Sequence, residues 1–298
     1  MDAIYIIMTS TLIAISCGIL GCFLILRKMA MVGDAISHAV LPGIVLAFLI
    51  SGSRDSVWMI LGAGLLGIFT TFLIEFFHKK ARLQTDAAIG VTFTWLFALG
   101  IILISVFAGQ VDLDQDCVLY GEIAYVPIDL WITEGGQNFG PRALWIASLI
   151  LIMNVLFVRA GFKQLYLTTF DPAFAATVGI SVSLWNYLLM GAVSMTTVAS
   201  FDSVGAILVV ALMVAPPATA YLLTDKFKQM IWITIVIAFI ISVFGYYLAV
   251  ALDGSIAGAI VTVSGILFAI AFLFSPSQGL ITKKFRNKKQ LTEASVIS

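Results

Sequence analysis

The chain has 298 residues, of which 61% are hydrophobic and only 11% are charged. Soluble domains carry roughly 25% charged residues, so this composition excludes a protein whose surface faces water on all sides. The formal net charge is zero, which gives no reason to expect a nucleic acid as partner, and the three cysteines have neither the spacing of a zinc motif nor that of a disulfide framework.

The dominant pattern along the chain is a series of long apolar stretches separated by short polar segments. A bilayer core of about 30 Å requires roughly 20 apolar residues in a helix that crosses it. The stretches are too long and too uniformly apolar for the strands of a membrane barrel, so we predict helices. In chain order, the predicted spans cover residues 3–26, 33–50, 57–77, 87–108, 142–159, 184–200, 205–223, 231–250 and 256–274.

This pattern predicts an all-α integral membrane protein, a polytopic helical bundle of about nine spans. A single transmembrane domain would cover residues 1–274, and a basic tail would follow over 275–298. We expect the first stretch to be a retained span rather than a cleaved signal, because no basic residue precedes it and it is longer than the apolar region of a signal peptide. Eight spans remain an alternative, since the stretch 33–50 is short and contains Asp34 and His38.

The basic residues are segregated along the chain. If nine spans alternate, 14 of the 16 Lys and Arg residues fall on one side, and only Arg54 and Arg142 fall on the other. Lys and Arg concentrate on the cytoplasmic side of membrane proteins. The sequence therefore predicts an outer N-terminus, a cytoplasmic C-terminus and an outer loop over 109–141. That loop is rich in acids, which suit a mouth that attracts cations but are also typical of a solvated loop.

The second predicted span contains two ionisable residues, Asp34 and His38. Such residues are costly inside a membrane and are functional candidates. Residues four apart share one face of a helix. A carboxylate and an imidazole suit Mn²⁺, Zn²⁺ or Fe²⁺, and two copies of the pair facing each other across a dimer axis would supply four ligands. The alternative is an Asp–His pair that only ties helices together.

The segment between the fifth and sixth spans has the pattern of a short, capped helix. Asp171 suits the N-cap and Pro172 the first helical position of a short helix over 172–178, which Gly179 would end. The segment lies on the predicted cytoplasmic side, where an amphipathic helix can dock into a groove of another protein. The alternative is a helix that lies on the lipid surface.

Several further features limit the function. The chain has no G-x-x-x-x-G-K-[ST] loop, so we do not expect it to hydrolyse ATP, and it assembles no catalytic Ser-His-Asp or Cys-His set. Pro216 and Pro217 interrupt the backbone hydrogen bonds of the seventh span, which therefore requires burial against protein or a cavity. Asp202, just before that span, is expected to cap it, and the alternative is that it faces a transport pathway.

Four stretches of the chain resemble the manganese/zinc/iron permease family of bacterial ABC importers. They are residues 27–43, which include G-D-A-I-S-H-A-V-L-P-G, residues 116–123 with D-C-V-L-Y-G-E-I, and the segments 171–179 and 205–223. The resemblance covers nearly the whole chain. It implies the fold of the vitamin-B12-type importer permeases. Two such permeases would lie in the bacterial cytoplasmic membrane, and two ATPase subunits would bind them on the cytoplasmic side.

The resemblance also implies roles for individual residues. Asp34 and His38 match the family motif and would be the metal ligands of the pathway. Residues 171–180 would be the coupling helix that an ATPase grips, and an extracytoplasmic metal-binding protein would dock on the outer face. The residues expected to couple the permease to the ATPase are Asp171, Pro172, Ala173, Ala176 and Gly179.

We therefore expect the permease subunit of an ATP-driven importer for manganese, iron or zinc ions, which acts as a dimer and is not itself an enzyme. The divalent ion would be cargo, and no permanently bound cofactor is expected. One alternative is a secondary transporter or channel in which Asp34 and His38 relay protons. Another is an ABC permease for a metal chelate such as a siderophore, although a chelated metal does not need intramembrane ligands.

Overall fold

A computed structural model describes residues 2–51, 56–107, 123–132, 138–275 and 279 of the chain. In this described part, nine helices are long and apolar enough to cross a membrane, which confirms nine spans rather than eight. They are α1 (Asp2–Leu26), α2 (Val32–Ser51), α3 (Ser56–Lys80), α4 (Thr85–Phe107), α6 (Arg142–Ala160), α9 (Val182–Val204), α10 (Ala206–Leu223), α11 (Phe227–Leu252) and α12 (Ile256–Phe274).

The shorter elements all lie between spans four and six. A single turn of 3₁₀ helix, η1 (Ile123–Tyr125), is followed by two antiparallel strands, β1 (Leu130–Ile132) and β2 (Asn138–Pro141). Two helices, α7 (Phe162–Phe170) and α8 (Pro172–Thr177), connect α6 to α9. The capped helix α8 was predicted, whereas α7 and the strand pair were not.

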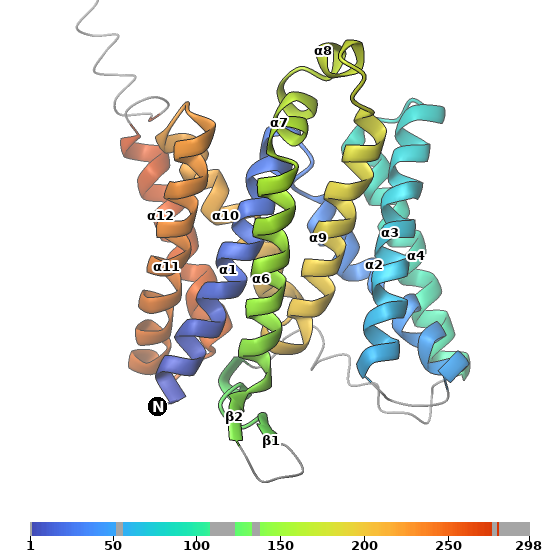
Figure 1. The fold of residues 1–298 in the computed structure, drawn as a ribbon. Helices are drawn as coiled ribbons and strands as arrows, with labels where there is room; N and C mark the ends of the chain where they lie inside the picture. Colours follow the sequence, from blue (N-terminus) through green and yellow to red (C-terminus); the bar gives the residue numbers. More distant parts are fainter. Residues whose placement is uncertain (1, 52–55, 108–122, 133–137, 276–278, 280–298) are drawn as a thin grey trace, which may run out of the picture.

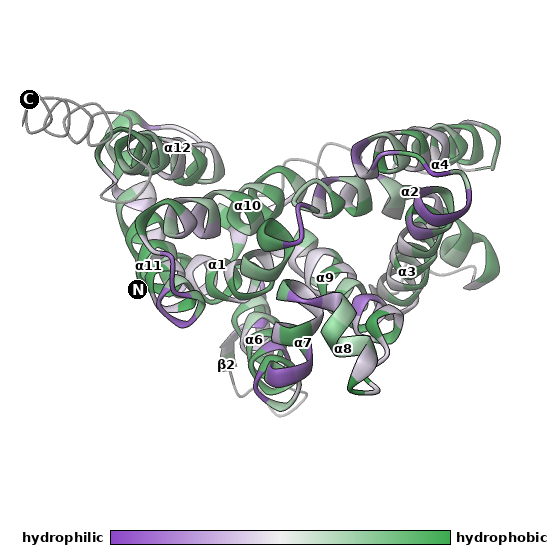
Figure 2. Cartoon of the chain, turned by 90° about the horizontal axis from the view of Figure 1, so that it is seen from above, coloured by the Kyte–Doolittle hydropathy of each residue, from purple (hydrophilic) through white to green (hydrophobic). Residues whose placement is uncertain are grey.

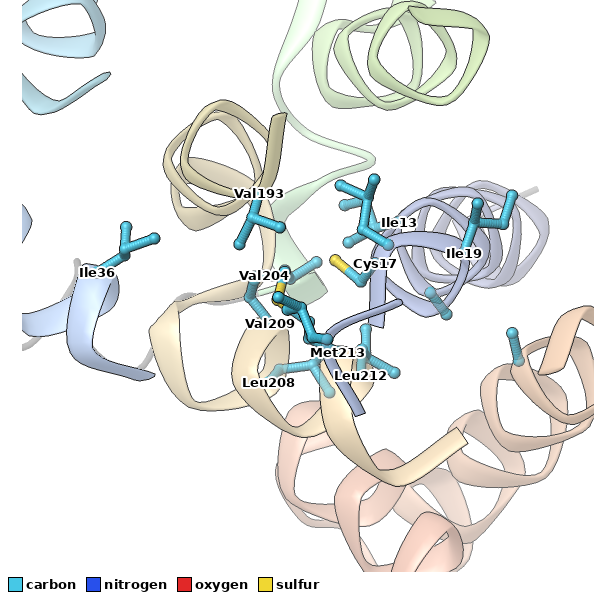
Figure 3. Close-up of a cluster of buried hydrophobic side chains, with 14 of the residues drawn as sticks. Ile13, Cys17, Ile19, Ile36, Val193, Val204, Leu208, Val209, Leu212 and Met213 are labelled. Carbon is cyan, nitrogen blue, oxygen red and sulfur yellow. The ribbon is translucent and has the colours of Figure 1, made fainter. Parts of the chain in front are cut away.

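The spans form two groups that α9 joins (Figures 1 and 2). α1 packs against α6, α10 and α11, and α12 covers α10 and α11. On the other side of α9, α2 packs against α3 and α4. Buried side chains gather between α1, α9 and α10, among them Cys17, Val204 and Leu212 (Figure 3). Many large apolar side chains on the outward faces are exposed, as expected of a surface that contacts lipid.

The two ends of the bundle differ in what they carry. α8, the α1–α2 turn and the last residues of α12 lie at one end, which we call the α8 end, and the N-terminus and the strand pair lie at the other (Figure 1). Arg27, Lys79 and Lys226 lie at the α8 end, as the segregation of basic residues predicts. Apart from Ser275 and Gly279, the predicted basic tail 275–298 falls outside the described residues.

The junction between α9 and α10 differs from the prediction. Gly205, with a φ of 78°, takes the N-cap position of α10, and α9 continues through Asp202 to Val204. Asp202 therefore lies within α9 and does not occupy the N-cap position of α10. The backbone conformation of Gly205 is one that glycine adopts readily and other residues avoid, so the turn is specified by the glycine rather than by the acid.

Candidate functional site

Asp34 and His38 lie on the first two turns of α2 and meet, as their spacing predicts. His38 Nε2 lies 3.6 Å from Asp34 Oδ1, and about a third of each side chain is exposed, 34% for His38 and 32% for Asp34. A carboxylate in the first turn is favoured by the positive end of the helix dipole. The pair is thus preformed and still accessible from outside the chain.

The imidazole of His38 is held by two aromatic rings of α4. The ring centroids of Phe93 and Phe97 lie 5.8 Å and 5.6 Å from that of His38. These contacts restrict the ring on the side that faces α4. At the α8 end, α2 begins further along the bundle than the neighbouring ends of α3 and α4 (Figure 1), so the first turns of α2 lie part-way along the bundle and not at its end.

One chain supplies an incomplete set of metal ligands here. Within the described residues, no group of three or more His, Cys, Asp or Glu side chains is close enough to hold a metal ion. Cys17 and Cys22 lie on α1, are buried in the core of the bundle, and are not close to Asp34 and His38 in such a group. A carboxylate and an imidazole can begin a coordination shell for a first-row transition metal, and further ligands must come from water or another chain.

The segment 171–180 adopts the capped helix that its sequence predicts. Asp171 Oδ1 accepts a hydrogen bond of 2.9 Å from the backbone N–H of Phe174, and Pro172 opens the helix. At the other end, Gly179 has a φ of 85°, and the N–H of Ile180 donates to the carbonyl of Ala175 at 2.9 Å. This is the bonding pattern of a Schellman cap. Both ends of α8 are therefore closed by local bonds.

The side chains of α8 divide into one buried and several exposed positions. Ala175 is fully buried and seats the helix on the bundle. The five residues predicted to couple to a partner are all exposed: Asp171, Pro172, Ala173, Ala176 and Gly179. Phe174 and Val178, which were not singled out from the sequence, expose 52% and 57% of their surface. Their spacing of four residues places two apolar side chains on one face, which was the signal available in the sequence.

A cavity of about 330 Å³ lies at the α8 end between the α1–α2 turn, α3, α7 and α9. Its polar lining includes Arg27, Glu75, Lys79 and Asn186. Glu75 is 8% exposed and forms an ion pair with Lys79, whose ammonium also donates to Ser183 Oγ at 3.0 Å. Sequence reasoning missed Glu75, although an acid inside the predicted span 57–77 was a visible signal.

Arg27 makes the most extensive polar contacts beside this cavity. Its guanidinium donates to the hydroxyls of Thr168 and Thr169 on α7 and to the side-chain carbonyl of Asn186 on α9. Burial lowers the pKa of Arg27 to about 10, so the group is still charged at neutral pH. The sequence placed Arg27 among the segregated basic residues and in the stretch 27–43 that resembles the family, but gave it no role of its own.

Comparison with known proteins points to one family. The ABC 3 transport family matches residues 3–275. The chain is similar to the manganese transport system membrane protein MntD of Bacillus subtilis, with 49% identity over 282 residues and 95% of each chain covered. It is also similar to the zinc transport system membrane protein TroD of Treponema pallidum, with 41% identity and coverage of 93% of this chain and 75% of that protein.

Among solved structures, the fold is similar to that of PsaBC from Streptococcus pneumoniae in complex with Fab. The TM-score is 0.75 at 32% identity, and the match covers 94% of each chain. The likeness therefore extends over the whole set of spans and is not confined to one pair of helices.

Proposed function

The chain belongs to the ABC 3 transport family and is the membrane-spanning permease subunit of a metal ion importer; from this premise we propose that Asp34 and His38 bind the transported ion. The observation that supports the proposal most directly is the approach of His38 Nε2 to Asp34 Oδ1, at 3.6 Å, inside a membrane span. The ion is a divalent transition metal, and manganese and zinc are the metals named in the two relatives. The permease itself breaks no bond of a substrate.

A second permease copy would complete the site. Two Asp34–His38 pairs that face each other supply two oxygens and two nitrogens, a mixed set that suits manganese, iron and zinc. Ligands divided between two chains can be separated when the chains slide or tilt. Such a site binds strongly enough to strip water from the ion and still releases it, which transport requires. The second copy is either the same chain or a related permease.

The energy of ATP hydrolysis would reach the permease through α8. We propose that a cytoplasmic ATPase subunit grips this helix at the exposed face around Phe174 and Val178, since a closed, capped helix with two exposed apolar side chains suits a groove in a partner. The α8 end then faces the cytoplasm, where the basic residues are expected. The opposite end, with the strand pair, faces outward and receives the ion from a metal-binding protein.

Uptake of individual metals tests this function. The assay uses a bacterial strain without its own manganese and zinc importers, supplied with the permease, its ATPase and its binding protein. We expect His38→Ala and Asp34→Asn to lower uptake by at least about tenfold, because each removes a ligand from the pathway. Matched controls are His78→Ala, at the exposed end of α3, and Asp86→Asn, an exposed acid in the first turn of α4.

Membrane content of each variant is measured alongside uptake. Unchanged uptake in His38→Ala at equal membrane content would exclude Asp34 and His38 as pathway ligands. Uptake by the permease without any ATPase subunit would favour a secondary transporter instead.

A further inference from the structure

Arg27 is the one residue of the α1–α2 turn whose side chain is bonded to both of the elements that flank α8. Its Nε donates to Thr169 Oγ1 at 3.0 Å and its Nη2 to Thr168 Oγ1 at 2.9 Å, both on α7. Its Nη1 donates to Asn186 Oδ1 at 2.9 Å, on α9. α7 ends just before α8 and α9 begins just after it. One guanidinium therefore holds the chain on either side of α8.

The acceptors of these bonds are oriented by α7 itself. The hydroxyl of Thr169 donates to the carbonyl of Leu165 at 2.6 Å, and that of Thr168 donates to the same carbonyl at 3.2 Å. Because each threonine hydroxyl donates its hydrogen to Leu165, its oxygen is free to accept a hydrogen bond from Arg27. The planar fork of arginine donates in fixed directions to several acceptors, which an ammonium on a flexible stem does not reproduce.

Arg27 is also close in the chain to the proposed metal ligands. The turn that it opens runs from residue 27 to 31, and α2 begins at Val32, two positions before Asp34. Backbone bonds stiffen this turn: Met29 N–H donates to Leu24 O at 2.9 Å, and Val32 N–H donates to Met29 O at 3.1 Å. A displacement of Arg27 is therefore transmitted to the start of α2 over a short, bonded segment.

The surroundings leave room for such a displacement. The cavity of about 330 Å³ lies beside Arg27 and Val32, between the turn and α3, α7 and α9. The Lys79 contact to Ser183 also crosses from α3 to α9, but Lys79 is largely exposed, with 55% of its side chain accessible. Exposed contacts of lysine are weak and easily rearranged. The half-buried guanidinium of Arg27, with three hydrogen bonds, is the stiffer connection across this region.

We infer that Arg27 is a positioning residue that couples the movement of α8 to the position of Asp34 and His38. The inference rests on the proposed function. ATPase closure pulls α8, the ends of α7 and α9 move with it, and Arg27 carries this movement to the start of α2, where the ligand pair opens or closes. When the Arg27 guanidinium is removed, the ATPase still hydrolyses ATP, but hydrolysis no longer drives ion release.

The test measures ATP hydrolysis and metal uptake together, in vesicles that contain the permease assembled with its ATPase and supplied with a metal-loaded binding protein. For Arg27→Lys, which keeps the charge, we expect hydrolysis within about twofold of the wild type and at least about tenfold fewer ions transported per ATP, a range typical of couplings between sites. Lys28→Gln is the matched control, since it removes the neighbouring exposed charge, and it keeps the wild-type ratio.

A second pair of variants addresses the acceptors. Thr168→Val combined with Thr169→Val removes both hydroxyls and should lower the ratio of ions to ATP as Arg27→Lys does, whereas Ser at both positions should retain it. Combining the Val pair with Arg27→Lys should add little, because both changes break the same contacts. A purely structural role would reduce assembly, uptake and hydrolysis in proportion.

The outcomes separate the two proposals. If wild-type vesicles take up no divalent metal, the proposed function fails. If they do and the ratio is unchanged in Arg27→Lys or in the Val pair, or if uptake and hydrolysis fall in proportion, the coupling role of Arg27 is wrong.

Discussion

Position 21 shows how a single residue sets the distance between two spans. A Cβ at Gly21 of α1 would lie 2.0 Å from the carbonyl oxygen of Met213 and 2.8 Å from Cγ of Pro217, both on α10. In a regular helix, the N–H of residue 217 would bond to that carbonyl, but proline has no N–H. The backbone of α1 therefore covers a carbonyl that the proline pair leaves without its helical donor. The glycine permits this close contact, and the contact makes the prolines tolerable inside the membrane.

Gly21→Ala is expected to destabilise the permease. The added methyl group must push α1 and α10 apart, which costs about 1–3 kcal/mol in a packed core. Thermal unfolding of the purified permease in detergent should show a lower midpoint for this variant. The matched control is Gly265→Ala in α12, where a Cβ meets nothing within 4 Å; it should leave the midpoint unchanged or raise it. Equal midpoints for Gly21→Ala and the wild type would contradict the close contact.

At this scale, the sequence predicts that Asp34 and His38 meet, but it does not predict which side chains surround them. Asp34 and His38 stand out because charge is rare inside a span, and their spacing correctly places them on one face. Phe93 and Phe97, which hold the His38 ring, come from a helix about 55 residues further along the chain, and no local pattern connects them to it. Glu75, which forms an ion pair with Lys79 one turn later, was not singled out from the sequence, although it lies inside the predicted span 57–77.

α8 shows how caps at both ends stabilise a short helix. Six residues are too few for stability by helix propagation, so the caps at Asp171 and Gly179 decide whether it forms. Both caps were visible in the sequence because capping is a local interaction between neighbours. The helix was therefore predicted to within a residue at its C-terminal end.

Asp171→Ala is expected to weaken the binding of the ATPase subunit. Loss of an N-cap costs about 1 kcal/mol, which corresponds to about a fivefold lower affinity if the partner binds only the formed helix. Asp171→Asn keeps an acceptor for the Phe174 N–H and should bind as the wild type does. Affinity is measured between the permease in lipid nanodiscs and the ATPase. Equal weakening by Asn and Ala would assign the effect to the lost charge and not to the cap.

The helix α7 could not be predicted from the length of apolar stretches. Phe162–Phe170 is too short for a span and follows α6 after Gly161 alone, so it does not stand out from the end of the fifth span. Its place depends on tertiary contacts. A Cβ at Gly161 would lie 2.4 Å from the ring of Trp185, and Phe162, Tyr166 and Phe170 all contact Phe227, with ring centroids about 6 Å apart. The regular spacing of these three aromatic residues was the available signal.

For the whole molecule, the alternation of spans could be predicted because hydropathy and charge act along the entire chain. The nine predicted spans agree with the helices to within a few residues at each end. The arrangement in space could not be predicted in the same way, since α9 joins two groups of helices through contacts between distant segments. The proposed partner subunits would likewise leave only indirect marks on one chain, such as an Asp–His pair with too few neighbouring ligands to hold a metal ion.

The orientation in the membrane can be tested with single cysteines in a variant whose three native cysteines are replaced by serine. Ile128→Cys lies at the strand-pair end and Thr177→Cys lies on α8, and both positions are exposed. We expect a membrane-impermeant maleimide to label Ile128→Cys in intact cells and Thr177→Cys only after the membrane is opened, because Lys and Arg concentrate on the cytoplasmic side of membrane proteins and the α8 end carries basic residues. The reverse pattern would invert the orientation.

The central claim is that His38 binds the transported metal directly. Pulsed electron paramagnetic resonance of Mn²⁺ bound to the purified permease detects imidazole nitrogen coordinated to the ion. We expect a nitrogen coupling in the wild type and in His78→Ala, and its loss in His38→Ala, with about one ion bound for every two permease chains. A nitrogen coupling that persists in His38→Ala would contradict the claim, since the metal would then have another ligand.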